Sequence, residues 1–194
     1  AVVSKVGELS PKIEEFLSQR IKTLIFDSST PLPIKNCYKT PSTLGPDRLA
    51  AAVGASALFP NRNVLVIDSG TAITYDLVTS NGHYLGGAIA PGISIRFKAL
   101  NQYTAKLPLL SISDDYPLIG ADTTSSILSG VLNGVVNEVD GYIDDVKAQY
   151  SALEIVFTGG DSFFFDKKLK NSIFVHPNLV LFGLNRILIY NENY

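Results

Sequence analysis

The sequence lacks several residue types and patterns, and each absence excludes a class of protein. It contains one cysteine, Cys37, so an internal disulfide framework cannot form, and this usage fits a reducing compartment. No apolar run is long enough to cross a bilayer, and the first residues do not have the pattern of a signal peptide. Methionine is absent and the chain opens Ala1-Val2-Val3, so we expect residues ahead of Ala1.

Basic clusters and common catalytic signatures are also missing. The formal net charge is −2 and the pI is about 5.7, and no block of Lys and Arg suggests nucleic acid or an anionic membrane as a partner. The sequence has no CxxC pair, no G-x-S-x-G and no GxxxxGK(S/T) motif. His83 and His176 are isolated, so we expect surface or turn residues rather than metal ligands.

The composition and the hydrophobic pattern predict a mixed α/β domain. Apolar residues make up 46% and charged residues 18%, enough for a sizeable core. Strands are expected over residues 1–6, 23–26, 63–68, 72–78, 84–90, 154–157 and 172–175, and helices over 11–20, 47–59, about 92–103, 122–150 and 177–190. Asn81-Gly82 predicts a hairpin turn within a three-strand meander. A meander followed by alternating helices and strands indicates a partly antiparallel sheet.

Boundary signals refine this prediction at three places. Ser10 is a plausible N-cap for the helix over 11–20, and residues 28–35, with two prolines, are expected to form a loop. Gly130, Gly134 and Gly141 weaken the long helix over 122–150, so a bend is expected there.

The sharpest local signal is the stretch DSGTAITYD, residues 68–76. Gly70 would let the backbone approach a phosphate closely, and Thr71 offers an N–H and a hydroxyl as donors. Asp68 would repel phosphate by itself, so its chemical use would be to hold a cation or a water. The alternative is a β-hairpin with an exposed acidic end.

A second signal is LGPDR, residues 44–48, which places an acid and an arginine at a helix N-terminus. Arg48 could hold a substrate carboxylate in bidentate fashion, and Asp47 could accept a proton from a substrate hydroxyl. An acidic residue at a helix start is also a common cap, and that alternative stays open on these residues alone.

Two glycine-rich stretches complete the candidates. Residues 86–92, GGAIAPG, suit close backbone packing or a ligand cradle before a helix, and residues 158–161, TGGD, turn a strand into a helix. Nucleotides often rest on such turns, but many β-α corners have the same composition.

Together these pieces resemble the type III pantothenate kinase family, from about Val2 to the C-terminus. The similar stretches are LGPDRLAAAVGA, VIDSGTAITYD, GHYLGGAIAPGISIRFKALNQYTAKLP, GADTTSSILSGVLNG, VFTGGD and LVLFGLNRIL. The resemblance implies an actin-like ATPase (ribonuclease H-like) fold, with two related half-domains of mixed sheets flanked by helices. Residues 1–60 would be the remainder of the N-terminal half-domain and residues 61–194 the C-terminal one.

The resemblance also implies an activity and its residues. The family phosphorylates pantothenate with ATP, uses Mg²⁺ and a monovalent cation (K⁺ or NH₄⁺), and works as a cytoplasmic homodimer. Asp47 resembles the general base, and Asp68 resembles the monovalent-cation ligand. The residues that resemble pantothenate contacts are Tyr38, Gly45, Pro46, Asp47, Arg48 and, across the dimer interface, Thr123, while those on the ATP side are Gly70, Thr71, Gly159 and Gly160.

One family feature has no counterpart in these residues. The family begins with a strand ending in D-x-G-N-(T/S) and a basic hairpin, which together wrap the ATP phosphates. Since phosphate cradling is most of what such an enzyme contributes, the 194 residues alone are expected to be inactive. Two other functions remain open: a non-catalytic accessory or regulatory factor, and another small-molecule kinase of the same fold group.

Overall fold

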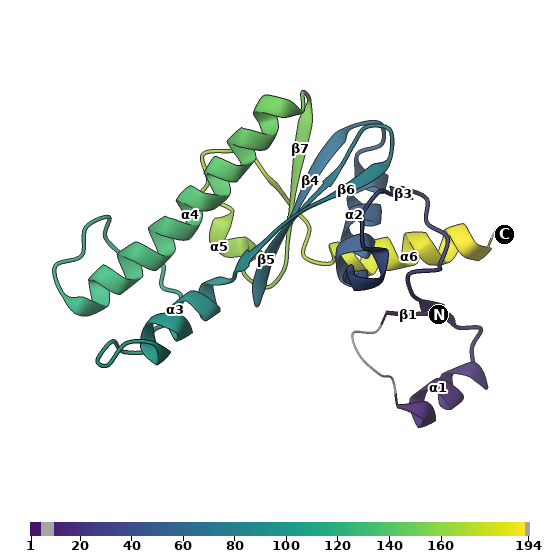
Figure 1. The fold of residues 1–194 in the computed structure, drawn as a ribbon, viewed down its shortest axis with the longest axis horizontal. Helices are drawn as coiled ribbons and strands as arrows, with labels where there is room; N and C mark the ends of the chain where they lie inside the picture. Colours follow the sequence, from purple (N-terminus) through teal and green to yellow (C-terminus); the bar gives the residue numbers. More distant parts are fainter. Residues whose placement is uncertain (5–9, 193–194) are drawn as a thin grey trace. The chain divides into compact units, whose positions relative to one another are not determined.

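The computed structural model describes residues 1–4 and 10–192, which form two compact units (Figure 1). Unit 1 comprises Ala1–Val66, Asp76–Gly86 and Asn178–Tyr194, and unit 2 comprises Ile67–Tyr75 and Gly87–Pro177. A six-stranded sheet has the strand order β3-β6-β5-β4-β7-β8. Three of its strands, β4, β5 and β6, pass from one unit into the other. The predicted α/β class, a mixed sheet flanked by helices, is confirmed.

The meander at the centre of this sheet is formed by β4 (Asn63–Ser69), β5 (Ala72–Val78) and β6 (His83–Pro91). β4 and β5 are neighbours joined by only two residues, so they run antiparallel. β3 (Lys35–Asn36) pairs parallel with β6, which makes the sheet mixed. Most side chains of β4 and β5 are buried on both faces; the β4 run is almost entirely apolar, whereas β5 also buries Asp76.

Unit 1 has its core between two helices, α2 (Pro46–Leu58) and α6 (Leu179–Glu192), which lie side by side (Figure 1). The helices approach closely because small residues face each other: a Cβ added at Gly183 would overlap the carbonyl oxygen of Ala50. Around them lie the parallel pair β1 (Val2–Ser4) and β2 (Leu24–Phe26), with α1 (Pro11–Ser18) between them in the chain. A short 3₁₀ helix, η1 (Pro41–Thr43), leads into α2.

Unit 2 contains α3 (Ile93–Gln102), the long α4 (Thr123–Gln149), β7 (Leu153–Thr158), α5 (Ser162–Phe165) and β8 (Phe174–Val175), with β8 parallel to β7. α4 starts at a capping box in which the Asp122 carboxylate accepts a hydrogen bond from the Ser125 backbone N–H at 2.9 Å. It then continues through all its glycines, because a buried apolar stripe along the helix supplies the packing.

Most sequence-based boundaries agree with these elements to within a few residues. β3 and η1 were not expected. Lys35, the last residue of the predicted loop, belongs to β3 because it pairs with His83. Ser10 is the N-cap of α1, as predicted, although its side chain makes no hydrogen bond to the helix. Residues 5 and 6 of the first predicted strand lie outside the described residues. The division into half-domains at residue 60 stays a prediction.

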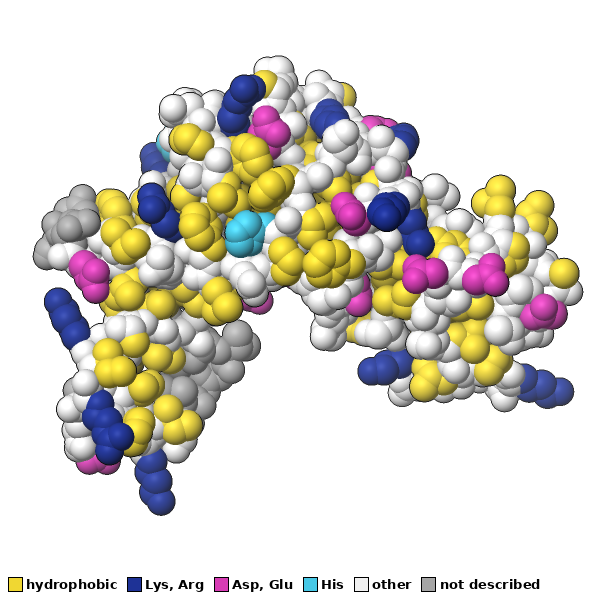
Figure 2. Space-filling model, turned by 180° about the vertical axis from the view of Figure 1, so that it is seen from behind, with side chains coloured by type: hydrophobic (Ala, Val, Ile, Leu, Met, Phe, Trp, Pro, Cys, Tyr) yellow, Lys and Arg dark blue, Asp and Glu magenta, His cyan; other side chains and the backbone are white. Residues whose placement is uncertain are grey.

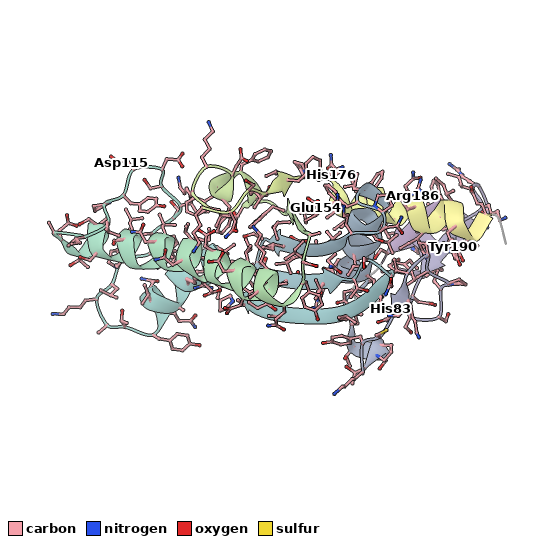
Figure 3. The ribbon with its side chains drawn as sticks, turned by 90° about the horizontal axis from the view of Figure 1, so that it is seen from above. His83, Asp115, Glu154, His176, Arg186 and Tyr190 are labelled. Atoms are coloured by element: carbon pink, nitrogen blue, oxygen red, sulfur yellow. The ribbon has the colours of Figure 1, made fainter. Side chains whose placement is uncertain are left out.

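Charged side chains of both signs are mixed on one face of the molecule (Figure 2), and the two histidines lie at the ends of strands. On the face shown in Figure 2, Lys and Arg side chains are scattered among Asp and Glu rather than gathered. His83 begins β6 and His176 follows β8 (Figure 3), and both side chains are partly buried. Within residues 1–4 and 10–192, every helix is too short or too polar to cross a bilayer.

Candidate active site

The N-terminus of α2 presents the candidate general base. Asp47 stands in the first turn, is exposed, and its Oδ1 accepts a hydrogen bond from the backbone N–H of Arg48 at 2.9 Å. This fold-back is possible because Gly45 has no side chain: a Cβ there would collide with Asp47 Oδ1. The helix N-terminus stabilises the ionised carboxylate. Asp47 is therefore a solvent-accessible carboxylate held in one place, as a general base requires.

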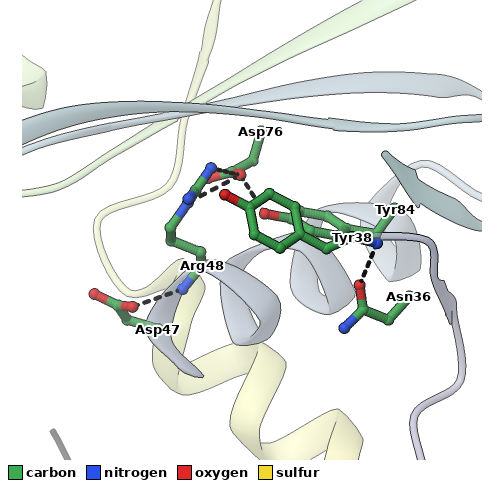
Figure 4. Close-up of polar contacts among 6 residues, drawn as sticks. All are labelled: Asn36, Tyr38, Asp47, Arg48, Asp76 and Tyr84. Carbon is green, nitrogen blue, oxygen red and sulfur yellow. Dashed lines mark hydrogen bonds and ion pairs between the residues drawn. The ribbon is translucent and has the colours of Figure 1, made fainter. Parts of the chain in front are cut away.

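The next residue, Arg48, points the other way and is buried. Its Nε donates to both carboxylate oxygens of Asp76, at 3.1 Å each, and its Nη2 donates to Asp76 Oδ1 at 2.7 Å. The Tyr84 hydroxyl donates to the same oxygen at 2.6 Å. Exposures are 8% for Arg48, 1% for Asp76 and 0% for Tyr84. Figure 4 shows the three side chains converging from α2, β5 and β6.

The electrostatics of this network agree with its geometry. Burial by itself would lower the pKa of Arg48, but the hydrogen bonds and charge of Asp76 outweigh burial and raise that pKa above its ordinary value. Burial and then the adjacent Asp76 charge raise the pKa of Tyr84 above its ordinary range. Arg48 is consequently a permanent cation and Tyr84 a neutral hydrogen-bond donor at any physiological pH.

Tyr38, in the segment that follows β3, is the fourth member of this cluster. Its backbone N–H donates to Asn36 Oδ1 at 2.9 Å, and its ring centroid lies 5.8 Å from Arg48 Cζ and 6.2 Å from the Tyr84 ring centroid. Gly86, with φ of +94°, makes room for the ring, because a Cβ there would lie 2.8 Å from Tyr38 Cδ2. The half-buried tyrosine is thus fixed beside the arginine.

Unit 1 therefore brings together the five predicted residues Tyr38, Gly45, Pro46, Asp47 and Arg48. Sequence reasoning missed Asp76 and Tyr84 as members of the cluster. A signal for Asp76 existed, since a carboxylate inside an apolar strand must find a partner when it is buried. Nothing in the spacing identified Arg48, 28 residues earlier, as that partner.

A second cluster lies in unit 2, at the turn between β4 and β5. Asp68 and Ser69 end β4, and the exposed Thr71 follows Gly70. A Cβ at Gly70 would meet no described atom within 4 Å, so the backbone there is open to a ligand. The Thr71 carbonyl accepts a hydrogen bond from the Gly92 N–H at 3.0 Å, which ties this turn to the chain that opens α3.

The TGGD turn packs directly against the same residues. Gly159 has φ of +92°, and a Cβ there would collide with the carbonyl oxygen of Ser69 and with Asp68 Oδ1. The Asp161 N–H donates to that carbonyl at 3.0 Å. The structure thus brings together Asp68, Gly70, Thr71, Gly159 and Gly160, which the sequence had offered as two separate signals.

Thr123 lies elsewhere in unit 2, as the first residue of α4, and is exposed. It borders a groove of about 1070 Å³ between α3 and α4. Both helices and the segments that follow α3 and precede α4 contribute lining residues: Arg96, Tyr103, Leu107, Ala121, Thr123, Ile127, Gly130 and Val131.

The residues near Asp68 fit a monovalent cation better than a protein-bound divalent one. Within the described part of the chain, no group of three or more His, Cys, Asp or Glu gathers as a metal cage. K⁺ and NH₄⁺ need only oxygen ligands, and Asp68 with nearby main-chain carbonyls can supply them. Mg²⁺ commonly binds through substrate phosphates with one or two carboxylates, so its use requires no such cage.

An α/β fold with an accessible acid at a helix start and open glycine turns beside a second acid has the features of a phosphoryl-transfer enzyme. The sequence model of the type III pantothenate kinase family matches residues 1–145. Proteins named type III pantothenate kinase in Bacteroides fragilis and Phocaeicola vulgatus are each 48% identical over 193 residues; the match covers 99% and 98% of this chain, respectively, and 79% of each relative. The chain belongs to the type III pantothenate kinase family.

A solved structure extends the likeness. A protein from Campylobacter jejuni, described as a Baf family transcriptional activator, superposes with a TM-score of 0.63 at 26% identity. The superposition covers 96% of this chain and 81% of that one. Its fold is therefore shared over nearly the whole chain.

Proposed function

We propose that this protein transfers the γ-phosphoryl group of ATP to pantothenate and so forms 4'-phosphopantothenate, the first step of coenzyme A biosynthesis, in the cytoplasm. The observation that carries the proposal is the family match, which extends over 99% of the chain at 48% identity. The accessible Asp47 at the start of α2 supports it, because phosphoryl transfer to an alcohol needs a base within reach of the hydroxyl.

On the pantothenate side, unit 1 supplies the groups. Asp47 takes the proton from the substrate hydroxyl as its oxygen attacks the γ-phosphorus, and ADP leaves with the bridging oxygen. Arg48 attracts the substrate carboxylate, and Tyr38 lines the same site. Gly45 and Pro46 set the position of Asp47 through the tight helix start.

On the ATP side, unit 2 supplies backbone groups. Gly70 and Thr71 approach the phosphates, and Gly159 and Gly160 form the turn next to the adenosine. Asp68 would hold the monovalent cation, and Mg²⁺ would be carried by the nucleotide phosphates. When bound, these ions would supply positive charge to the transferring phosphoryl group.

A second copy of the chain completes the pantothenate site with its own Thr123. The groove between α3 and α4 supports this arrangement, because it is large, mostly apolar and bordered by Thr123. Apolar residues close to the groove are also exposed, among them Tyr103 at 81% and Ile119 at 84%.

The central experiment is an ADP-release assay on the full-length gene product with pantothenate, ATP, Mg²⁺ and K⁺. Asp47→Asn keeps the shape at the helix start and removes the base, so kcat should fall by about 10²–10⁴-fold while ATP affinity stays nearly intact. Asp115→Asn is the matched control, an exposed acid in a loop (Figure 3), and should leave kcat unchanged. An Asp47→Asn variant with full kcat would refute the base.

The cation assignment has its own test. Asp68→Ala should abolish the dependence of turnover on added K⁺ or NH₄⁺, since the main negative ligand is removed. A variant that responds to K⁺ as the parent does would show that Asp68 is not the cation ligand.

An accessory or regulatory role is the second candidate, favoured by the description of the Campylobacter jejuni protein as a transcriptional activator. Pantothenate-dependent ADP release would decide for the kinase. Sugar phosphorylation without pantothenate phosphorylation would instead indicate another kinase of the fold group.

A further inference from the structure

The Asp76 carboxylate is a buried charge that the proposed reaction does not itself use. It lies inside β5, in the core of unit 1, and accepts hydrogen bonds from the Arg48 guanidinium and from the Tyr84 hydroxyl. A buried ion pair is often no more stabilising than apolar residues of the same shape. Its presence beside the proposed substrate site therefore points to a geometric purpose.

The contact between Asp76 and Arg48 shows which edge of the guanidinium is held. Asp76 engages the edge of the guanidinium formed by Nε and Nη2, with three hydrogen bonds of 2.7–3.1 Å. A planar guanidinium held along one edge has a fixed plane, and its Nη1 end is directed away from Asp76. Tyr84 in turn holds Asp76 through a 2.6 Å hydrogen bond.

We propose that Asp76 and Tyr84 are positioning residues that fix the guanidinium of Arg48, so that its Nη1 end selects substrates with a terminal carboxylate. This inference rests on the proposed function, because it assumes that Arg48 meets the carboxylate of pantothenate. It adds two residues to that function and assigns them to substrate specificity rather than to proton transfer.

Two physical effects of Asp76 on substrate binding have opposite signs. Its negative charge offsets that of Arg48 and weakens the attraction for a substrate carboxylate. Its hydrogen bonds fix the guanidinium before the substrate binds. This strengthens binding, because Arg48 then loses less conformational entropy when the substrate arrives. Positioning dominates in this proposal, so neutralising Asp76 should weaken carboxylate binding rather than strengthen it.

Tyr84→Phe is the cleanest variant, since it removes one hydroxyl and leaves the network's charges unchanged. The full-length gene product is assayed by ADP release with pantothenate and with pantothenyl alcohol, in which a hydroxymethyl group replaces the carboxylate. The KM for pantothenate should rise about 10-fold with kcat nearly unchanged, in line with the loss of a hydrogen bond to a charged group. The KM for the alcohol should change less than about twofold. Tyr75→Phe, also buried in β5 but bonded to Glu138, is the control and should change neither.

Asp76→Asn extends the test and should raise the KM for pantothenate further than Tyr84→Phe. If it does not fold, Tyr84→Phe decides alone. A lower KM for pantothenate in Asp76→Asn, or equal changes for both ligands in either variant, would overturn the inference and leave the kinase intact. A parent protein that phosphorylates neither ligand would overturn the proposed function, and this inference with it.

Discussion

The candidate cluster of unit 1 and the candidate cluster of unit 2 are built in opposite ways. In unit 1 the chemistry is carried by side chains, with a buried arginine, aspartate and tyrosine joined by short hydrogen bonds. In unit 2 it is carried by backbone, and three turns meet where glycines leave space. A carboxylate substrate is recognised by a charged fork, whereas phosphates are recognised by N–H groups that no side chain obstructs.

This difference predicts opposite sensitivities to substitution. Unit 1 should lose function when atoms are removed from Arg48, Asp76 or Tyr84. Unit 2 should lose function when atoms are added at the points where its turns already contact one another, as they do at Gly159. Pairs of glycines test this difference. Within each pair the two positions differ in one structural property, such as whether an added Cβ would contact neighbouring atoms.

The largest effect is expected at Gly159. In Gly159→Ala the new Cβ would meet the Ser69 carbonyl and the Asp68 carboxylate, in a backbone conformation that L-residues avoid. We expect a loss of about 1–3 kcal/mol in the free energy of unfolding, measured by denaturant titration. ATP affinity should fall as well, because the turn must move away from Asp68.

Gly160→Ala is the matched control for this change. Gly160 is the next residue, and no described atom lies within 4 Å of its built Cβ. Stability should change by less than about 0.5 kcal/mol, as for an ordinary surface site. Equal losses in both variants would mean that the contact with Ser69 and Asp68 does not define the turn.

A smaller effect is expected at Gly86, where an added Cβ would be in close contact with the ring of Tyr38. Gly82 also has a positive φ, +72°, but no described atom lies within 4 Å of its built Cβ. Alanine at either position should cost about 1–2 kcal/mol of backbone strain. Only Gly86→Ala should also raise the KM for pantothenate, by a few-fold, and equal KM values for the two variants would separate Tyr38 from the substrate site.

The sequence was sufficient for the elements and for the positions of the motifs. Apolar periodicity located α1, α4 and α6, the alanine-rich run after Pro46 located α2, and Pro91-Gly92 located the end of the meander and the start of α3. Short elements were missed for a physical reason: β3 has two residues and exists only because Lys35 and Asn36 pair with β6. Pairing between distant segments leaves no local periodicity to read.

The site was predicted in pieces rather than as clusters. Asp47 and Arg48 are adjacent in sequence, and their shared helix start predicted an acid and an arginine at one place. Their side chains diverge, however, since Asp47 is exposed and Arg48 is buried on Asp76. That direction depends on how α2 packs on the sheet, which the five-residue motif does not encode.

The smallest effect is expected in α4, where glycines have neither a close contact nor a positive φ. Both Gly130 and Gly141 are exposed, and their built Cβ atoms meet no described atom within 4 Å. Alanine in a helix interior is more stable than glycine by about 0.5–1 kcal/mol, so each variant should raise Tm by about 1–4 °C.

Gly130 borders the groove proposed to receive a second copy and Gly141 does not. Gly130→Ala should therefore also weaken self-association in sedimentation, whereas Gly141→Ala should not. A fall in Tm for Gly141→Ala would contradict the expectation that an added Cβ at this position meets no other atoms. Unchanged self-association in Gly130→Ala would show that the dimer contact does not involve this groove.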